Sequence, residues 1–289
     1  MNGSPGPKVV FPGDEDRPAL GLGTWRLGED ASSADAEVAA VRRAMQLGYR
    51  VIDTAEMYGE GGAETVVGRA VAEALGAGEV SRDELFIVSK VYPHNAGRRS
   101  ALEACERSLE RLGLDTLDAY LLHWPGSVPL AETIAAFEAL QDKGRIRHWG
   151  VSNFDLERMQ ALFRLPGGDR CAINQIYYSL GERGPAFDLL PWQQARQIVT
   201  MAYSPLDQGA LSRNPSLQQI AARLNATASA VALVWLTGQE GVMAIPKSVD
   251  EGRLRDNRRA ADIRLSADDL VEIDRAFPPP RRRSPLAML

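Results

Sequence analysis

Short apolar runs alternate with amphipathic segments of helix length along most of this 289-residue chain. The apolar runs are nearly continuous, which is typical of strands that are buried on both faces of a parallel sheet. Eight runs have strand length and predict strands at residues 19–23, 50–54, 85–90, 117–123, 148–153, 171–175, 199–204 and 242–246. The amphipathic segments predict helices at residues 33–47, 62–75, 98–112, 130–143, 156–163, 187–197, 216–224, 229–239 and 251–260.

The chain order favours an α/β fold of the (β/α)₈ TIM-barrel type over an open doubly wound sheet. Eight strand–helix units follow one another, and no linker or change of composition divides them. A doubly wound dinucleotide-binding sheet also needs G-x-G-x-x-G after its first strand. Gly21 and Gly23 begin such a pattern, but Gly28 comes two positions too late. We therefore expect residues 1–289 to form a single barrel domain with a short N-terminal turn and a short C-terminal tail.

Local signals set several boundaries within this pattern. Ser32 or Ser33 is the expected N-cap of the helix at 33–47, because a hydroxyl can accept from a free N–H of the first turn. Gly113 is expected to end the helix at 98–112 in a left-handed conformation. Pro191 is expected to interrupt the helix at 187–197, because proline lacks an N–H donor.

Composition and charge exclude several classes of protein. The 33 Lys and Arg against 38 Asp and Glu give a net charge of −5, which argues against nucleic acid as the main ligand. Cys105 and Cys171 are too few for a disulfide framework and indicate a reducing compartment. The first residues, MNGSPGPK, do not resemble a secretory signal, and the most apolar stretch, 230–236, is far shorter than a membrane span. We expect a cytoplasmic protein with no membrane or nucleic-acid partner.

Polar side chains follow the eight predicted strands. In a barrel the carboxyl ends of the strands form one face, and this face carries the chemistry. The groups found there are Thr24 with Trp25, Asp53, Lys90, His123 with Trp124, Ser152 with Asn153, Gln175, Tyr203 with Ser204, and Lys247 with Ser248. A solvated loop would also be polar, but it would not place such a group after every apolar run. The pattern therefore predicts an active site at this face.

Four of these positions predict a proton-transfer site. A free tyrosine is a poor acid at neutral pH, but an ammonium such as Lys90 would stabilise the phenolate of Tyr58 and lower its pKa. Asp53 could hold Lys90 charged and in place, and His123 could donate a hydrogen bond to a carbonyl oxygen. Such a site can protonate an oxyanion, but a hydride has to come from a cofactor.

Other strand ends outline a place for that cofactor. The amides of Asn153 and Gln175 suit a carboxamide, and Tyr203 offers a flat ring for stacking. Lys247, Ser248 and Arg253 form a compact phosphate-binding group near the start of the last helix. These residues predict a nicotinamide nucleotide laid across the barrel mouth.

The motifs that hold these residues resemble the aldo-keto reductase family. The strings DTAEMYGEGGAE, LFIVSKVYP, LLHWPG, GVSNF, NQIYYS, MAYSPL and IPKSVDEGRLRDN carry the resemblance, which runs from about Pro18 to Phe277 and is strongest with short bacterial members that reduce methylglyoxal. The family implies a (β/α)₈ barrel that uses NADP(H) to reduce aldehydes and ketones, and a monomer is its usual state.

The resemblance also implies roles for individual residues. The catalytic tetrad falls on Asp53, Tyr58, Lys90 and His123, with Tyr58 as general acid. The expected cofactor-binding residues are Gly23, Thr24, Trp25, Asp53, Ser152, Asn153, Gln175, Tyr203, Ser204, Leu206, Lys247, Ser248, Arg253 and Asn257. The expected substrate-binding residues are Trp25, Tyr58, Tyr92, His123 and Trp124.

Some positions depart from the family pattern. Asp256 stands where Glu or Gln is usual near the adenine, and Asp207 and Gln208 replace small residues of the pyrophosphate clasp. The tail after Phe277 is short, so we expect the C-terminal loop that closes the pocket in longer members to be reduced. These features predict an open, shallow pocket walled by Trp25, Tyr92 and Trp124. The arginines at 281–283 are expected to be a solvated tail.

Two other functions are compatible with a barrel of this kind. One is a nucleotide-binding sensor or partner protein with negligible turnover. The other is a phosphate-binding isomerase, which would need a carboxylate base and no nicotinamide cradle. A metal site is not expected, because His94, His123 and His148 lack the H-x-H or H-E-x-x-H spacing.

Overall fold

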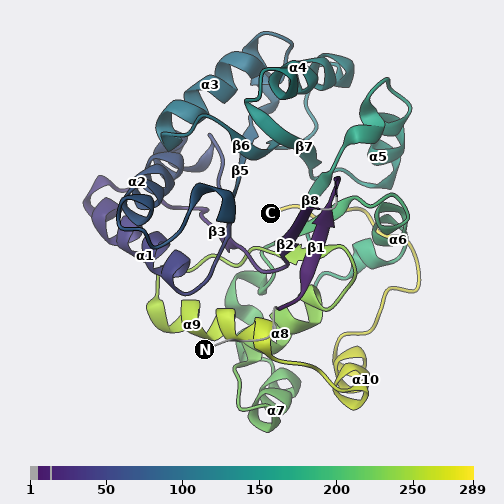
Figure 1. Ribbon diagram of the computed structural model, residues 1–289. Helices are drawn as coiled ribbons and strands as arrows, with labels where there is room; N and C mark the ends of the chain where they lie inside the picture. The colour runs from purple at the N-terminus through teal and green to yellow at the C-terminus, as the bar shows by residue number, and fades with distance from the viewer. Residues whose placement is uncertain (1–5, 14) are drawn as a thin grey trace.

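The chain folds as a closed ring of parallel strands surrounded by helices (Figure 1). The structure is a computed structural model that describes residues 6–13 and 15–289. Residues 1–8, from which we expected no secretory signal, lie mostly outside the described residues. The sheet holds, in chain order, β3 (Leu22–Gly23), β4 (Val51–Asp53), β5 (Phe86–Val91), β6 (Leu117–Leu122), β7 (Ile146–Ser152), β8 (Ile173–Tyr177), β9 (Val199–Tyr203) and β10 (Val242–Ala244). Parallel bridges Leu20–Ala244 and Gly23–Lys247 join its two ends. The predicted (β/α)₈ barrel is confirmed.

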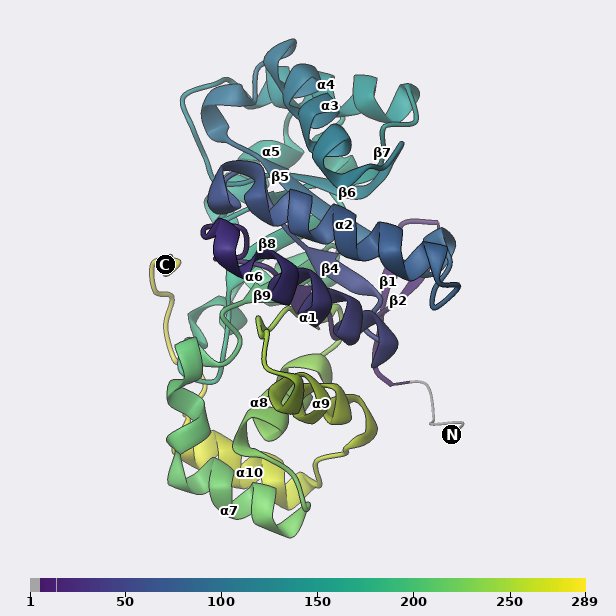
Figure 2. The same cartoon turned by 90° about the vertical axis from the view of Figure 1, so that its left-hand side faces the viewer.

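The nine predicted helices are present with small shifts of their ends. They are α1 (Ala34–Gln46), α2 (Gly62–Gly76), α3 (Ser100–Leu112), α4 (Leu130–Asp142), α5 (Leu156–Phe163), α6 (Leu189–Gln194), α7 (Pro215–Arg223), α8 (Ala228–Thr237) and α9 (Glu251–Arg259). Figure 2 shows α1 and α2 packed side by side on the outside of the sheet. A tenth helix, α10 (Ala267–Ala276), was not predicted, although Ser266 and Asp269 form a capping box at its start.

A hairpin that was not predicted closes the opposite end of the barrel from the site. Strands β1 (Lys8–Phe11) and β2 (Glu15–Pro18) pair antiparallel across the turn at 12–13. The ring of Phe11 lies 4.6 Å from the ring of Phe86, the first residue of β5. Phe11 therefore covers the amino-terminal ends of the strands, and any ligand must enter at the carboxyl ends.

Two local predictions are corrected by the structure. Ser33 stands at the N-cap of α1, but its side chain makes no capping bond; Asp30 instead caps a short 3₁₀ turn at Ala31–Ser33 and accepts from the N–H of Ser32. Pro191 does not interrupt a helix, because α6 begins only at Leu189 and the proline lies in its first turn, where no N–H bond is needed. Gly113 has φ of +63° at the end of α3, as predicted.

Helix α8 is buried along its whole length against the barrel. No single helix in the described part of the chain is long and apolar enough to span a membrane. Helices α7 and α8 taken together would be long and apolar enough, but they are bent by 87° at the break between them.

Candidate active site

The carboxyl ends of the strands surround a cavity of about 950 Å³. Sixteen of the residues predicted for the site line it: Gly23, Trp25, Asp53, Tyr58, His123, Trp124, Ser152, Asn153, Gln175, Tyr203, Ser204, Leu206, Lys247, Ser248, Arg253 and Asn257. Thr24, Lys90 and Tyr92 are the predicted site residues that do not line it. The site predicted from the strand ends is thus one continuous space.

Lys90 lies behind the cavity wall and hydrogen-bonds two other members of the predicted tetrad. Its side chain is completely buried at the end of β5. The ammonium donates to Asp53 Oδ2 at 2.8 Å, to the carbonyl oxygen of Thr54 at 2.8 Å and to the Tyr58 hydroxyl at 3.1 Å. These three hydrogen bonds use all three N–H groups of the ammonium. They therefore fix its positive charge next to the hydroxyl of Tyr58.

Asp53 is fixed on both of its oxygens. Oδ2 accepts from Lys90, and Oδ1 accepts from the amide Nε2 of Gln175 at 2.7 Å. Gln175 comes from β8, across the barrel from β4. Its amide nitrogen therefore orients the carboxylate, a contact that the strand-end pattern did not predict.

The pKa of Tyr58 is raised above its usual value, which corrects the expectation that it would be lowered. Burial is the largest cause, because it disfavours the phenolate, and the charge of Asp53 acts in the same direction. Lys90 lowers the pKa of Tyr58 as predicted, but by less than burial raises it. Burial also lowers the pKa of Lys90, but attraction by Asp53 and Tyr58 outweighs burial and leaves it raised. The site at rest therefore holds an ammonium and a neutral phenol.

His123 lies beside Tyr58 as a neutral imidazole. The two ring centroids are 5.6 Å apart with an interplanar angle of 74°. Burial, followed by repulsion from the charge of Lys90, lowers the pKa of His123 well below 6.5. Nδ1 is buried and has no hydrogen-bond partner among the described residues. A neutral imidazole of this kind can donate one hydrogen bond into the cavity without adding charge.

Three side chains on neighbouring strand ends are linked beside the tetrad. Asn153 has a left-handed backbone, with φ of +61°, and its Nδ2 donates to the carbonyl oxygen of His123 at 3.2 Å. Its Oδ1 accepts from the hydroxyl of Tyr203 at 2.9 Å. The Tyr203 ring stacks on Tyr177 at 5.9 Å, and the Tyr177 hydroxyl donates to Asp207 at 3.0 Å. Asp207, which departs from the family pattern, thus supports the stacked tyrosines.

The far end of the cavity is cationic. Lys247 is exposed and makes no ion pair within residues 6–13 and 15–289. Arg253 lies in the first turn of α9 and makes only a long contact with Asp250, at 3.9 Å. Ser248 and Asn257 are buried beside them. Two cations with little compensation near a helix N-terminus favour a phosphate group.

Thr24 and Tyr92 lie outside the cavity. The Thr24 side chain is buried, and its hydroxyl donates to the carbonyl oxygen of Asp53 at 2.9 Å, so it ties β3 to β4. The Tyr92 hydroxyl donates to Glu60 at 3.0 Å, and its ring packs edge-on against Trp124 at 5.9 Å. Tyr92 therefore supports Trp124, which lines the cavity, and is not itself part of the wall.

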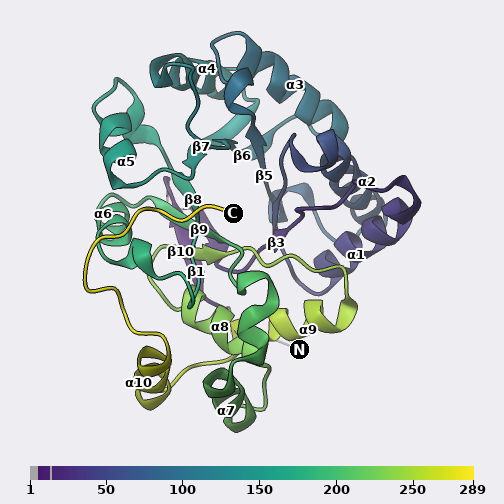
Figure 3. The ribbon, with the colours of Figure 1, turned by 180° about the vertical axis from the view of Figure 1, so that it is seen from behind.

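The C-terminal tail reaches the cavity, so the pocket is not open in the way that was predicted. The tail runs from α10 past α6 and ends at the centre of the barrel mouth (Figure 3). Met288 and Leu289 line the cavity, and the backbone N–H of Leu289 donates to the Tyr203 hydroxyl at 3.4 Å. The prediction failed because it was based on tail length, and even a short extended tail spans the barrel mouth at about 3.3 Å per residue.

Several further lining residues were not predicted. Gln208 and Asp256, which the resemblance placed near the cofactor, line the cavity as well. The residues that were not named are Arg26, Met57, Pro205, Gly209, Ser212, Thr227, Ala228, Ser229, Ile245 and Pro246. Most of these unnamed residues lie in the turn after β9 or at the start of α8, and of those only Pro205 belongs to a quoted motif, MAYSPL. Thr227 could have been found, because it is the N-cap of α8 and faces the same mouth. The described residues contain no group of three or more His, Cys, Asp or Glu side chains suited to a metal ion.

The chain is similar to known proteins over nearly its whole length. The model of the aldo/keto reductase family matches residues 19–277. Methylglyoxal reductase YeaE of Escherichia coli K12 is 48% identical over 97% of this chain and 98% of that protein. Glyoxal reductase of Bacillus subtilis is 38% identical over 90% and 88%. A Klebsiella pneumoniae aldo/keto reductase solved with NADP and acetate is 45% identical, with a TM-score of 0.93 over 98% and 100%. The chain belongs to the aldo/keto reductase family.

Proposed function

We propose that the protein is a reductase that uses NADP(H) to convert aldehydes and ketones into alcohols, with small 2-oxoaldehydes such as methylglyoxal among its substrates. The observation that carries the proposal is the Tyr58 hydroxyl, held 3.1 Å from the buried ammonium of Lys90 in a cavity with a cationic far end. The relatives support it, because one is a methylglyoxal reductase and another was solved with NADP.

Tyr58 serves as the general acid in this proposal. Its raised pKa keeps the hydroxyl protonated at neutral pH, so a proton is always present for the oxygen of the substrate. The phenolate that remains is stabilised by the ammonium of Lys90, which Asp53 holds in place. The acid is therefore activated at the moment of proton transfer and not by ionisation at rest.

His123 and Trp124 position the carbonyl group beside that acid. His123 is uncharged, so it can donate a hydrogen bond to the carbonyl oxygen without competing for the proton of Tyr58. Trp25 and Trp124 provide apolar walls on the same cavity. Two tryptophan walls beside a positioned acid suit a compact carbonyl compound.

The cavity fits a nicotinamide nucleotide, which supplies the hydride when bound. Lys247 and Arg253 would hold the 2′-phosphate, because they are cations with little compensation at the far end of the cavity. Tyr203 would stack on the nicotinamide, and Asn153 and Ser152 would meet its carboxamide. Gln175 would offer only its oxygen, since its nitrogen is committed to Asp53.

The proposal is tested by the loss of nicotinamide absorbance when NADPH is mixed with methylglyoxal and the protein. Tyr58→Phe should lower kcat by about 10²- to 10⁴-fold, the usual contribution of a positioned acid. Tyr178→Phe is the matched control, because its hydroxyl bonds to Gln239 at 2.8 Å outside the cavity. An active Tyr58→Phe enzyme would refute the mechanism.

The same assay separates the reductase from the sensor. A sensor would bind NADPH tightly and oxidise it with none of a panel of methylglyoxal, aromatic aldehydes, aldoses and keto esters. We further propose that residues 1–289 act as one barrel domain, that the enzyme is a monomer, and that it works in the cytoplasm. Both cysteines are free and buried, which agrees with a reducing compartment. Light scattering of the purified protein and cell fractionation would test these points.

A further inference from the structure

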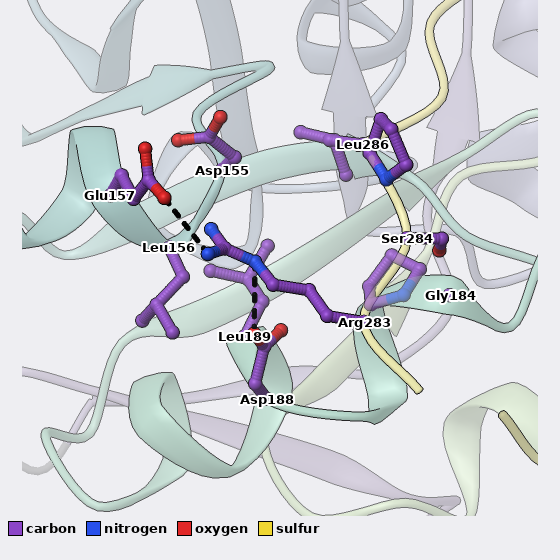
Figure 4. A pocket seen from close by; sticks show the side chains of 11 residues that line it. Asp155, Leu156, Glu157, Gly184, Asp188, Leu189, Arg283, Ser284 and Leu286 are labelled. Atoms are coloured by element: carbon purple, nitrogen blue, oxygen red, sulfur yellow. Dashed lines mark hydrogen bonds and ion pairs between the residues drawn. The ribbon is translucent and has the colours of Figure 1, made fainter. Parts of the chain in front are cut away.

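The C-terminal tail is tied to the barrel at a point well before the cavity. The guanidinium of Arg283 pairs with Glu157 Oε1 at 2.9 Å and, through Nε, with Asp188 Oδ2 at 3.2 Å (Figure 4). Glu157 lies in the first turn of α5, and Asp188 directly precedes α6. Arg283 therefore bridges two helices that are separate in the chain.

The surroundings of Arg283 are more acidic than one cation requires. Asp155, Glu157 and Asp188 all line the small pocket under the tail, and Arg283 is the only cation among the described residues that line it. The neighbouring Arg281 and Arg282 are exposed and make no ion pair within the described residues. The attachment is thus specific to one of the three consecutive arginines, which were together expected to be a solvated tail.

Contacts on either side of Arg283 define which parts of the tail are fixed. Arg183 donates to the carbonyl oxygen of Phe277 and pairs with Asp274 at 2.8 Å, which fixes the root of the tail. Leu286 is partly buried against the main core. Beyond it, the one hydrogen bond that holds the described tail end is the 3.4 Å contact from Leu289 to Tyr203. The position of Met288 and Leu289 in the cavity thus depends on the attachment at Arg283.

We propose that Arg283 is a positioning residue that sets the size of the carbonyl compounds the enzyme admits. Its two ion pairs place Met288 and Leu289 over the mouth, where they narrow access to Tyr58 and His123. The inference rests on the proposed reductase function, since it concerns access to that same site. Arg283 lines the small pocket under the tail and not the cavity of the active site.

The main test compares substrate selectivity in matched variants. Arg283→Ala should raise the ratio of kcat/KM for a bulky aromatic aldehyde to kcat/KM for methylglyoxal by about three- to tenfold, the range for a partly exposed ion-pair network. Deletion of residues 288–289 should raise it at least as much, and Arg282→Ala should leave it unchanged. An unchanged ratio in Arg283→Ala, or an equal change in Arg282→Ala, would overturn the proposal.

Salt provides a second readout on the wild-type enzyme. The Arg283 side chain is 44% exposed, so its ion pairs are screened as ionic strength rises. The selectivity ratio of the wild type should drift with salt toward that of Arg283→Ala, whereas the ratio of the variant should stay constant. Both substrates are uncharged and share one cofactor, so effects on cofactor binding cancel. If Arg283→Ala alters only NADPH dissociation and not this ratio, the role in substrate size is refuted.

A measurement without turnover separates this proposal from the reductase function. The methyl carbon of Met288, assigned by its loss in Met288→Leu, reports on the cavity by NMR. Met288 is already 53% exposed, so in Arg283→Ala its signal should move to the position of a methionine in an unstructured chain, and in Arg282→Ala it should not. A wild type that oxidises no NADPH would end the proposed function, whereas an unmoved Met288 signal in Arg283→Ala would end the role of Arg283.

Discussion

Replacing Lys90 with methionine removes the charge that faces Tyr58 while keeping the shape of the buried side chain. The ammonium lies 3.1 Å from the phenol oxygen. At an effective dielectric constant of about 20, a full phenolate charge at that distance is stabilised by about 5 kcal/mol. If about half of the charge has developed in the transition state, Lys90→Met forfeits about 2.5 kcal/mol. We therefore expect kcat to fall on the order of a hundredfold.

The assay is NADPH oxidation at saturating cofactor, with the double variant Lys90→Met/Tyr58→Phe as the decisive comparison. If Lys90 acts through Tyr58, the double variant should be no slower than Tyr58→Phe alone, because the phenol that Lys90 assists is already gone. Losses that multiply in the double variant would refute the reasoning. Undiminished kcat in Lys90→Met would refute it as well.

The stability of this variant needs its own control. Lys90→Met leaves Asp53 buried without its cation, and breaking a buried pair in this way costs about 3–5 kcal/mol. Lys90→Met/Asp53→Asn removes both charges and keeps an amide beside Gln175, so it should recover part of that stability. Comparison of the urea midpoints separates loss of fold from loss of the acid.

Three other predictions concern pH, cofactor choice and backbone strain. The pKa of His123 is lowered well below 6.5, so below about pH 6.5 the unfolded chain binds up to one more proton than the folded one. The free energy of unfolding should therefore decrease as the pH is lowered through this range, by up to about 1.4 kcal/mol per pH unit. Urea midpoints across pH 5–7 should therefore slope less in His123→Asn, and equal slopes would contradict this. Lys247→Ala should weaken NADPH binding roughly tenfold and leave NADH binding unchanged, as measured by fluorescence titration, whereas equal weakening of both would count against a phosphate contact. Gly28→Ala should lower the free energy of unfolding by about 2–4 kcal/mol, because the φ of Gly28 is +70° and a Cβ would lie 2.1 Å from the backbone of Gly62. Gly76→Ala is the control for thermal melts, because a Cβ there meets nothing within 4 Å, and it should be neutral or stabilising.

The barrel could be predicted because its strands are buried on both faces. That burial requires nearly continuous apolar runs such as Phe86–Val91 and Leu117–Leu122, and their spacing follows from the helices between them. The hairpin of β1 and β2 lacks this signal, since both strands are short and charged, β1 is buried only at alternate positions and no residue of β2 is fully buried. Its contribution comes from Phe11 against Phe86, a contact between distant parts of the chain that no local pattern contains.

The positions of the site residues were predictable, but their electrostatics were not. A strand end fixes where Asp53, Lys90 and His123 lie, because the fold brings all strand ends to one face. The direction of a pKa shift depends on how deeply each group is buried, and this is a property of the packed structure. The sequence suggested that Lys90 would decide the pKa of Tyr58, whereas burial decides it.

Lys90, behind the cavity wall, and Lys247, which lines the cavity, differ in a way that separates chemistry from binding. Lys90 is completely buried and compensated by Asp53, so its charge acts over a short range on Tyr58. Lys247 is exposed and makes no ion pair with any described residue, so its charge is available to an anion arriving from solvent. A protein with a net charge of −5 can therefore attract an anionic cofactor locally while keeping the reaction centre nearly neutral. Substitutions at Lys247 should accordingly change the affinity for the cofactor, and substitutions at Lys90 should change kcat.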